Sequence, residues 1–136
     1  AYISNFRRGV VEVVDTTTFQ VKHEIEVGAN PKFMVVSPDG TRLYVALYSQ
    51  QRVAIVDLAS REVRRMVRTG RQPRGMAMRP DGTLLVESFR GDIVQVLTAD
   101  GDETERGEHP RQAEDMNAER IEQCRHNAGG DRGAGS

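Results

Sequence analysis

The sequence predicts an all-β fold built from repeated units of four antiparallel strands. A stretch at residues 37–46 returns 42 residues later at 79–88, and each copy places Pro-Asp-Gly between two short apolar runs. Proline presets φ, aspartate bonds nearby amides and glycine accepts a positive φ, so each copy predicts a β-hairpin. A hairpin that recurs at this spacing is typical of stacked β-units.

The predicted strands follow one another in the same order in each repeat. Residues 2–6 and 10–14 are strand-like and flank a turn, and residues 20–27 alternate between apolar and charged side chains, which indicates a half-buried strand. A Gly-Ala-Asn-Pro break at 28–31 leads into the first hairpin. The remaining predicted strands repeat this order: 33–36, 43–48, 52–56, 62–69, 74–78, 84–89 and 93–97.

Four strands per period of 42 residues are typical of a β-propeller blade. The chain holds about two and a half such blades, because the first lacks its inner strand and the last lacks its outer strand. Closed propellers need about four to eight blades, and open blade edges invite pairing with other chains. We therefore expect an incomplete ring, which is either a fragment of a larger propeller with missing blades or a chain that closes the ring by self-association.

Residues 99–136 differ in composition from residues 1–98. The first 98 residues carry 14 basic and 10 acidic side chains, whereas the rest carry 5 basic and 10 acidic ones. Apolar residues are also too few there for a further strand. We therefore expect propeller repeats over 1–98 and a polar acidic tail over 99–136 that is disordered, with at most a weak helix at 112–125. Truncation after Thr98 should then leave the β-structure intact.

Several functional classes are disfavoured by what the sequence lacks. A single cysteine, Cys124, excludes an intramolecular disulfide. No apolar run is long enough to span a membrane. The first residues have neither a basic nor an apolar segment of a signal peptide, so we expect that such a peptide is either absent or already lost. His109, Cys124 and His126 are the one cluster of metal-ligand type, but their spacing is not that of a zinc site. We predict no metal ligand and no cofactor.

Five short motifs resemble the YVTN family of β-propeller repeats. They stand in the family's order and spacing, and the resemblance covers roughly residues 1–97: 2–5 (YISN), 11–16 (VEVVDT), 27–31 (VGANP), 37–41 (SPDGT) and 43–46 (LYVA). The resemblance implies a bacterial or archaeal propeller that is periplasmic, secreted or on the cell surface. Similar propellers include lactone-hydrolysing enzymes and haem- or quinone-linked redox subunits, so the fold alone does not define a reaction.

The resemblance also singles out two residues as possible contacts at the mouth of a central channel. Where the family has glycine just after the proline that begins the inner strand, this chain has Phe33, whereas the second copy keeps the glycine after Arg74. The inner strand of a blade lines the channel of a propeller. Phe33 and Arg74 are therefore expected near the channel mouth.

The densest basic run has two interpretations. It could bind phosphate or an acidic partner, or it could be the solvated outer edge of a blade, where charge prevents edge pairing. The run accompanies no nucleic-acid-binding motif, so we favour the solvated edge and predict no nucleic-acid partner. Its members are Arg61, Arg64, Arg65, Arg68, Arg71 and Arg74.

The sequence favours a binding role over an enzymatic one. It contains no nucleophile elbow, no phosphate-binding glycine loop and no triad, so no catalytic residue is predicted. The leading hypothesis is a binding or scaffolding module that takes a protein or a glycan as partner. The alternative is part of a propeller enzyme or redox subunit, either a lactonase-like hydrolase or a haem- or quinone-linked dehydrogenase subunit, with Phe33 and Arg74 near its site.

Overall fold

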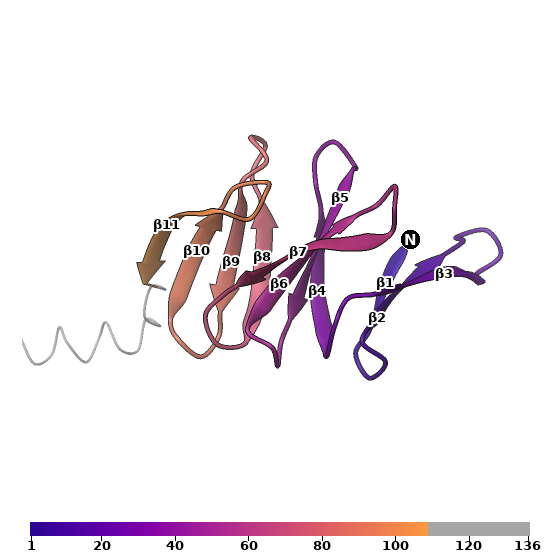
Figure 1. Ribbon diagram of the computed structural model, residues 1–136, viewed down its shortest axis with the longest axis horizontal. Helices are drawn as coiled ribbons and strands as arrows, with labels where there is room; N and C mark the ends of the chain where they lie inside the picture. Colours follow the sequence, from indigo (N-terminus) through magenta and orange to yellow (C-terminus); the bar gives the residue numbers. More distant parts are fainter. Residues whose placement is uncertain (109–136) are drawn as a thin grey trace, which may run out of the picture.

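The computed structural model describes residues 1–108, which form eleven strands and, within that range, no helix. The strands make three antiparallel sheets that stand side by side along the longest axis of the molecule (Figure 1). Their residues include no helix long and apolar enough to cross a membrane. The three antiparallel sheets confirm the predicted all-β fold of propeller blades.

The first sheet, blade 1, has three strands, and the other two, blades 2 and 3, have four strands each. Blade 1 comprises β1 (Tyr2–Asn5), β2 (Val10–Val14) and β3 (Val21–Glu26). Blade 2 comprises β4 (Pro31–Val36), β5 (Arg42–Leu47), β6 (Arg52–Asp57) and β7 (Glu62–Arg68). Blade 3 comprises β8 (Pro73–Met78), β9 (Leu84–Ser88), β10 (Ile93–Leu97) and β11 (Glu103–Glu108).

The last strand corrects the sequence analysis. Residues 99–136 were expected to hold no further strand, yet β11 pairs with β10 from Glu103, opposite Leu97, to Glu108, opposite Ile93. The turn before β11 also contacts blade 2. The Ala99 carbonyl accepts hydrogen bonds from Arg42 Nη1 at 2.6 Å and from the Tyr44 hydroxyl at 2.9 Å. The prediction of a disordered tail was therefore wrong for these residues, and its remainder at 109–136 lies outside the described residues.

The third blade is one residue shorter than the second in its first turn. The turn in blade 2 closes with the Ser37 N–H on the Arg42 carbonyl, whereas that in blade 3 closes with the Arg79 N–H on the Thr83 carbonyl. The residues of β9 and β10 therefore match the residues 41, not 42, positions earlier in blade 2. As a result, Gln95 occupies the place of Ala54 and is fully buried. The residues of β11 match β7 at 40 positions.

Two apolar clusters hold the blades together, one at each junction between neighbours. Between blades 1 and 2 the cluster contains Val11, Ile25, Val27, Leu43, Val45, Leu47, Ala54 and Val56. Between blades 2 and 3 it contains Tyr44, Val53, Ile55, Val67, Leu84, Val86 and Leu97. Because alternate residues of a strand face opposite sides, each central strand of blade 2 contributes to both clusters.

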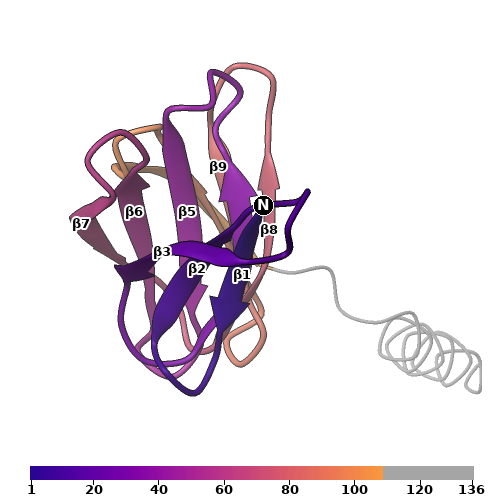
Figure 2. The ribbon, with the colours of Figure 1, turned by 90° about the vertical axis from the view of Figure 1, so that its right-hand side faces the viewer.

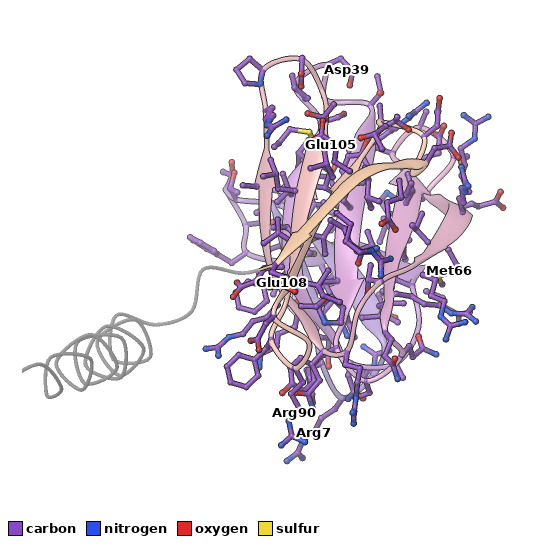
Figure 3. The ribbon with its side chains drawn as sticks, turned by 90° about the vertical axis from the view of Figure 1, so that its left-hand side faces the viewer. Arg7, Asp39, Met66, Arg90, Glu105 and Glu108 are labelled. Atoms are coloured by element: carbon purple, nitrogen blue, oxygen red, sulfur yellow. The ribbon has the colours of Figure 1, made fainter. Side chains whose placement is uncertain are left out.

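Loops gather at the two ends of the strands (Figure 2). Asp39 lies at one end, which we call the aspartate end, whereas Arg7 and Arg90 lie at the other, the arginine end (Figure 3). In the first turn of blade 2 the Asp39 carboxylate accepts hydrogen bonds from the Ser37 hydroxyl at 2.5 Å and from the Thr41 amide at 3.0 Å. The Asp81 carboxylate accepts the equivalent bond from the Thr83 amide in blade 3. Hydrogen bonding within the turn is therefore sufficient to account for an aspartate at this position in each hairpin.

Truncation after Thr98 should destabilise the chain, contrary to the expectation from sequence. It removes the β11 ladder and the bonds from Arg42 and Tyr44 to the Ala99 carbonyl. With about 1 kcal/mol for each lost hydrogen bond, we expect the free energy of unfolding to fall by about 3 kcal/mol or more. Thermal melting followed by circular dichroism would measure the change. Truncation after Glu108 is the control, and equal melting temperatures for the two truncated chains would contradict the role of β11.

The Asp39 turn should make stability depend on pH in the acid range. The hydrogen bond from the Ser37 hydroxyl, and then those from Thr41, lower the pKa of Asp39 to about 2. Because this pKa is below the unfolded value of about 3.9, the contribution is complete above that value and is lost as pH falls through about 2. Asp39→Ala should therefore melt at a lower temperature than the native chain at pH 7, and the gap should close between about pH 4 and pH 2. A gap that persists unchanged at pH 2 would contradict this account.

Candidate functional site

A pocket of about 400 Å³ lies where the inner strands of blades 2 and 3 begin. It is lined by Phe33 from β4, Arg74 and Gly75 from β8, Glu87 from β9, and Phe89 just after β9. Both phenylalanine rings are exposed, Phe33 to 39% and Phe89 to 51%. The pocket thus offers two aromatic surfaces, one guanidinium and one carboxylate to a ligand.

Local backbone irregularity helps to position the pocket residues. Each inner strand begins with a buried proline that follows a residue of positive φ, Asn30 at 56° and Gln72 at 55°. The pairing register then shifts between Pro31 and Phe33 in β4, and between Pro73 and Met76 in β8. Such bulges change the direction of nearby side chains and are common beside binding sites.

A cation stacked on an aromatic ring recurs in both blades at this end. Lys32 Nζ lies 4.5 Å from the centre of the Tyr48 ring in blade 2, and the Arg74 guanidinium lies 5.2 Å from the centre of the Phe89 ring in blade 3. A cation within about 6 Å of a ring centre is attracted by its π electrons. The repeated pair holds each basic side chain against its own blade, and in blade 3 it shapes one wall of the pocket.

Gly75 gives the Glu87 side chain its place in the pocket. A Cβ added at residue 75 would lie 2.5 Å from Glu87 Oε2 and 3.3 Å from Glu87 Cβ. A larger residue would therefore compete with the carboxylate for the same space. Phe33, at the equivalent place in blade 2, instead supplies a ring to the pocket.

The structure brings together both residues that the sequence singled out. Phe33 and Arg74 come from different blades, yet they line one pocket. Sequence reasoning missed Glu87 and Phe89. The aromatic residue that follows the second strand in both blades, Tyr48 and then Phe89, is a signal that could have revealed the stacked pairs.

Other candidates from the sequence do not join this pocket. Arg61 of the basic run contacts His23, with Nη1 at 3.3 Å from Nδ1. His109, Cys124 and His126 lie outside the described residues. Among residues 1–108, no group of three or more His, Cys, Asp or Glu side chains is placed to hold a metal ion.

The family described as a domain of unknown function, DUF7165, matches residues 2–114. The chain belongs to this family. No curated protein matches this DUF7165 chain in sequence.

Solved structures similar to this DUF7165 chain are β-propeller proteins. Hydrazine synthase of Kuenenia stuttgartiensis is 27% identical with a TM-score of 0.74, and the similarity covers 79% of this chain and 33% of that one. Dihydro-heme d1 dehydrogenase NirN, solved in complex with DHE, is 20% identical with a TM-score of 0.69, covering 79% and 25%. Virginiamycin B lyase from Staphylococcus aureus is 14% identical with a TM-score of 0.68, covering 82% and 38%.

These similarities establish the fold. The DUF7165 chain spans a quarter to two fifths of the length of these structures. The last two similarities are below 25% identity and bear on the fold alone.

Gly75→Ala should test the close contact between β8 and Glu87. The new methyl group would displace the carboxylate, and we expect a loss of about 1 kcal/mol in the free energy of unfolding because the displaced group is the flexible end of a side chain. Gly107→Ala is the matched control, since a Cβ at that position meets no atom within 4 Å. Urea unfolding would compare the two variants. Equal midpoints would show that residue 75 does not restrict Glu87.

Proposed function

We propose that this chain is a YVTN-type segment of a larger, exported propeller and acts as a binding module, with the pocket at Phe33, Arg74, Glu87 and Phe89 as its ligand site. The ligand class that fits best is a saccharide. Apolar faces of sugar rings stack on aromatic side chains, and sugar hydroxyls bond to guanidinium and carboxylate groups. The assembly of these groups from two neighbouring blades is the observation that carries the proposal.

The position of the pocket supports a site within a larger ring. β4 and β8 are the inner strands of their blades and are neighbours in space. In a closed propeller such strands surround the central channel. A pocket at their first residues would therefore open at the mouth of that channel, where further blades would add to it.

The outer face of blade 3 supports the presence of a further neighbouring blade. Leu85 and Val94 match Tyr44 and Val53 of blade 2, which are completely buried against blade 3. Leu85 and Val94 themselves are only partly buried. Apolar side chains in these positions suit a face that packs on another blade, either from the same chain or from a second copy.

A role within an enzyme or redox subunit is the second candidate. It rests on the name of one similar structure, hydrazine synthase, which is 27% identical to this chain. Arg74 and Glu87 would then position a substrate at the channel mouth. Conversion of the bound ligand into a product, measured with the same preparation, would favour this candidate over a binding module.

Binding to a glycan array, followed by calorimetry with the best ligand, would test the proposal. Phe33→Ala removes one aromatic wall and should weaken binding by about tenfold, which corresponds to about 1.4 kcal/mol. Arg74→Gln should have a similar effect because it removes the guanidinium and its stacking on Phe89. The ligand should be recovered unchanged after incubation with the chain, as expected for a binding module.

The matched control is Phe19→Ala. Phe19 is 81% exposed, and it follows β2 in a turn at the aspartate end, away from the pocket. This variant should bind within about twofold of the native chain. Equal weakening by Phe19→Ala and Phe33→Ala would place binding elsewhere, and no binding to any glycan of the array would reject the saccharide.

A further inference from the structure

A second hollow, separate from the pocket, lies between the outer strands of blades 2 and 3. Its volume is about 560 Å³, and four arginines line it: Arg68, Arg71, Arg90 and Arg106. They come from the end of β7, from the loops before β8 and β10, and from β11. The sequence shows Arg68 and Arg71 as part of one basic run, but it gives no sign that Arg90 and Arg106 join them.

Backbone hydrogen bonds fix the segments that carry three of these arginines. The Arg90 N–H donates to the Arg71 carbonyl at 3.2 Å, and the Thr69 N–H beside Arg68 donates to the Gln51 carbonyl at 2.9 Å. The loops thus form a fixed rim, so the arginines are anchored at their backbones before any ligand arrives.

Gly70 allows the close approach of the blades beneath this rim. A Cβ at residue 70 would lie 2.6 Å from Ser88 Oγ, so no side chain fits there. The Gly70 N–H donates to Oε1 of the buried Gln95 at 2.9 Å, and Gln95 Nε2 donates to Glu103 at 2.7 Å. A polar network therefore connects the loop before β8 to β10 and β11.

The charges in the hollow are only partly balanced. Arg106 pairs with Glu103, with Nε 2.6 Å from Oε1. In the described part of the chain, Arg68, Arg71 and Arg90 make no ion pair and no side-chain hydrogen bond. By contrast, two arginines near the aspartate end are paired, Arg42 with Asp100 at 2.8 Å and Arg65 with Asp102 at 2.9 Å.

We propose that this hollow binds a small ligand that carries two or more tetrahedral oxyanions, either phosphate or sulfate esters. Guanidinium groups form paired hydrogen bonds with such oxyanions, and three of them on a fixed rim can hold more than one anionic group. The volume lies within the range of small-molecule sites. The site shares no residue with the pocket at Phe33, so the proposal does not depend on the saccharide.

Isothermal titration of the full chain with sodium tripolyphosphate and, separately, with sucrose octasulfate tests the proposal. At least one probe should bind saturably, and its identity distinguishes phosphate from sulfate. Binding should weaken as salt rises, because exposed charges are screened. The variant Arg68→Gln/Arg71→Gln/Arg90→Gln should lose at least about tenfold in affinity, and Arg90→Gln alone about threefold.

The matched control removes the same charge outside the hollow. Arg7→Gln/Arg61→Gln/Arg64→Gln should keep the affinity within about twofold if the ligand is held by direct contacts rather than by the overall field. Circular dichroism would verify that each variant folds. If the triple variant does not fold, the single variant Arg90→Gln provides the test. Absence of saturable binding of both probes, or equal losses in test and control variants, would overturn the proposal.

Discussion

Apolar packing between blades 2 and 3 determines where both candidate sites lie. The cluster around Tyr44 and Leu84 closes the blades face to face, and this contact sets β4 beside β8 at the inner side. The pocket at Phe33 and Arg74 exists because these two strands begin next to each other. At the outer side the same packing places the end of β7 near β10 and β11, which creates the arginine hollow. Neither site belongs to one blade alone.

Polar groups inserted between the blades make this packing specific. Gln95 stands in blade 3 where blade 2 has Ala54, and it is buried with bonds to the Gly70 amide and to Glu103. A buried amide that satisfies both its donor and its acceptor in this way tolerates little displacement, because an unpaired polar atom in the interior is costly. The Ala99 carbonyl, bonded by both Arg42 and Tyr44, has a similar role near the opposite end. Together these bonds restrict sliding of one blade over the other.

The hairpins could be predicted from sequence because Pro-Asp-Gly turns between apolar runs carry their own local signal. β11 could not, since its side chains are exposed along its whole length and its order comes from backbone pairing with β10. Phe33 and Arg74 were found through the resemblance to a repeat family, read against both copies of the repeat. Glu87 lies in β9 and Phe89 just after it, and both enter the pocket only through tertiary packing. The sequence comparison aligned blade 3 with blade 2 at a constant spacing of 42 residues, which is wrong by one residue after the first turn of blade 3. The Pro-Asp-Gly motif is intact in that turn, so the motif gives no sign that the turn is one residue shorter.

The two ends of the strands differ in charge for a reason rooted in turn chemistry. At the aspartate end each hairpin turn needs an acceptor for its own backbone amides. The carboxylates of Asp39 and Asp81 are therefore occupied by hydrogen bonds within their turns. At the arginine end backbone bonds such as that from Arg90 to Arg71 join the loops. Within the described residues, the side chains of Arg68, Arg71 and Arg90 take no part in hydrogen bonds or ion pairs. Side chains that the fold does not use can change without loss of stability. Unpaired arginines at this end, including Arg90 (Figure 3), are therefore better explained by a ligand than by the fold.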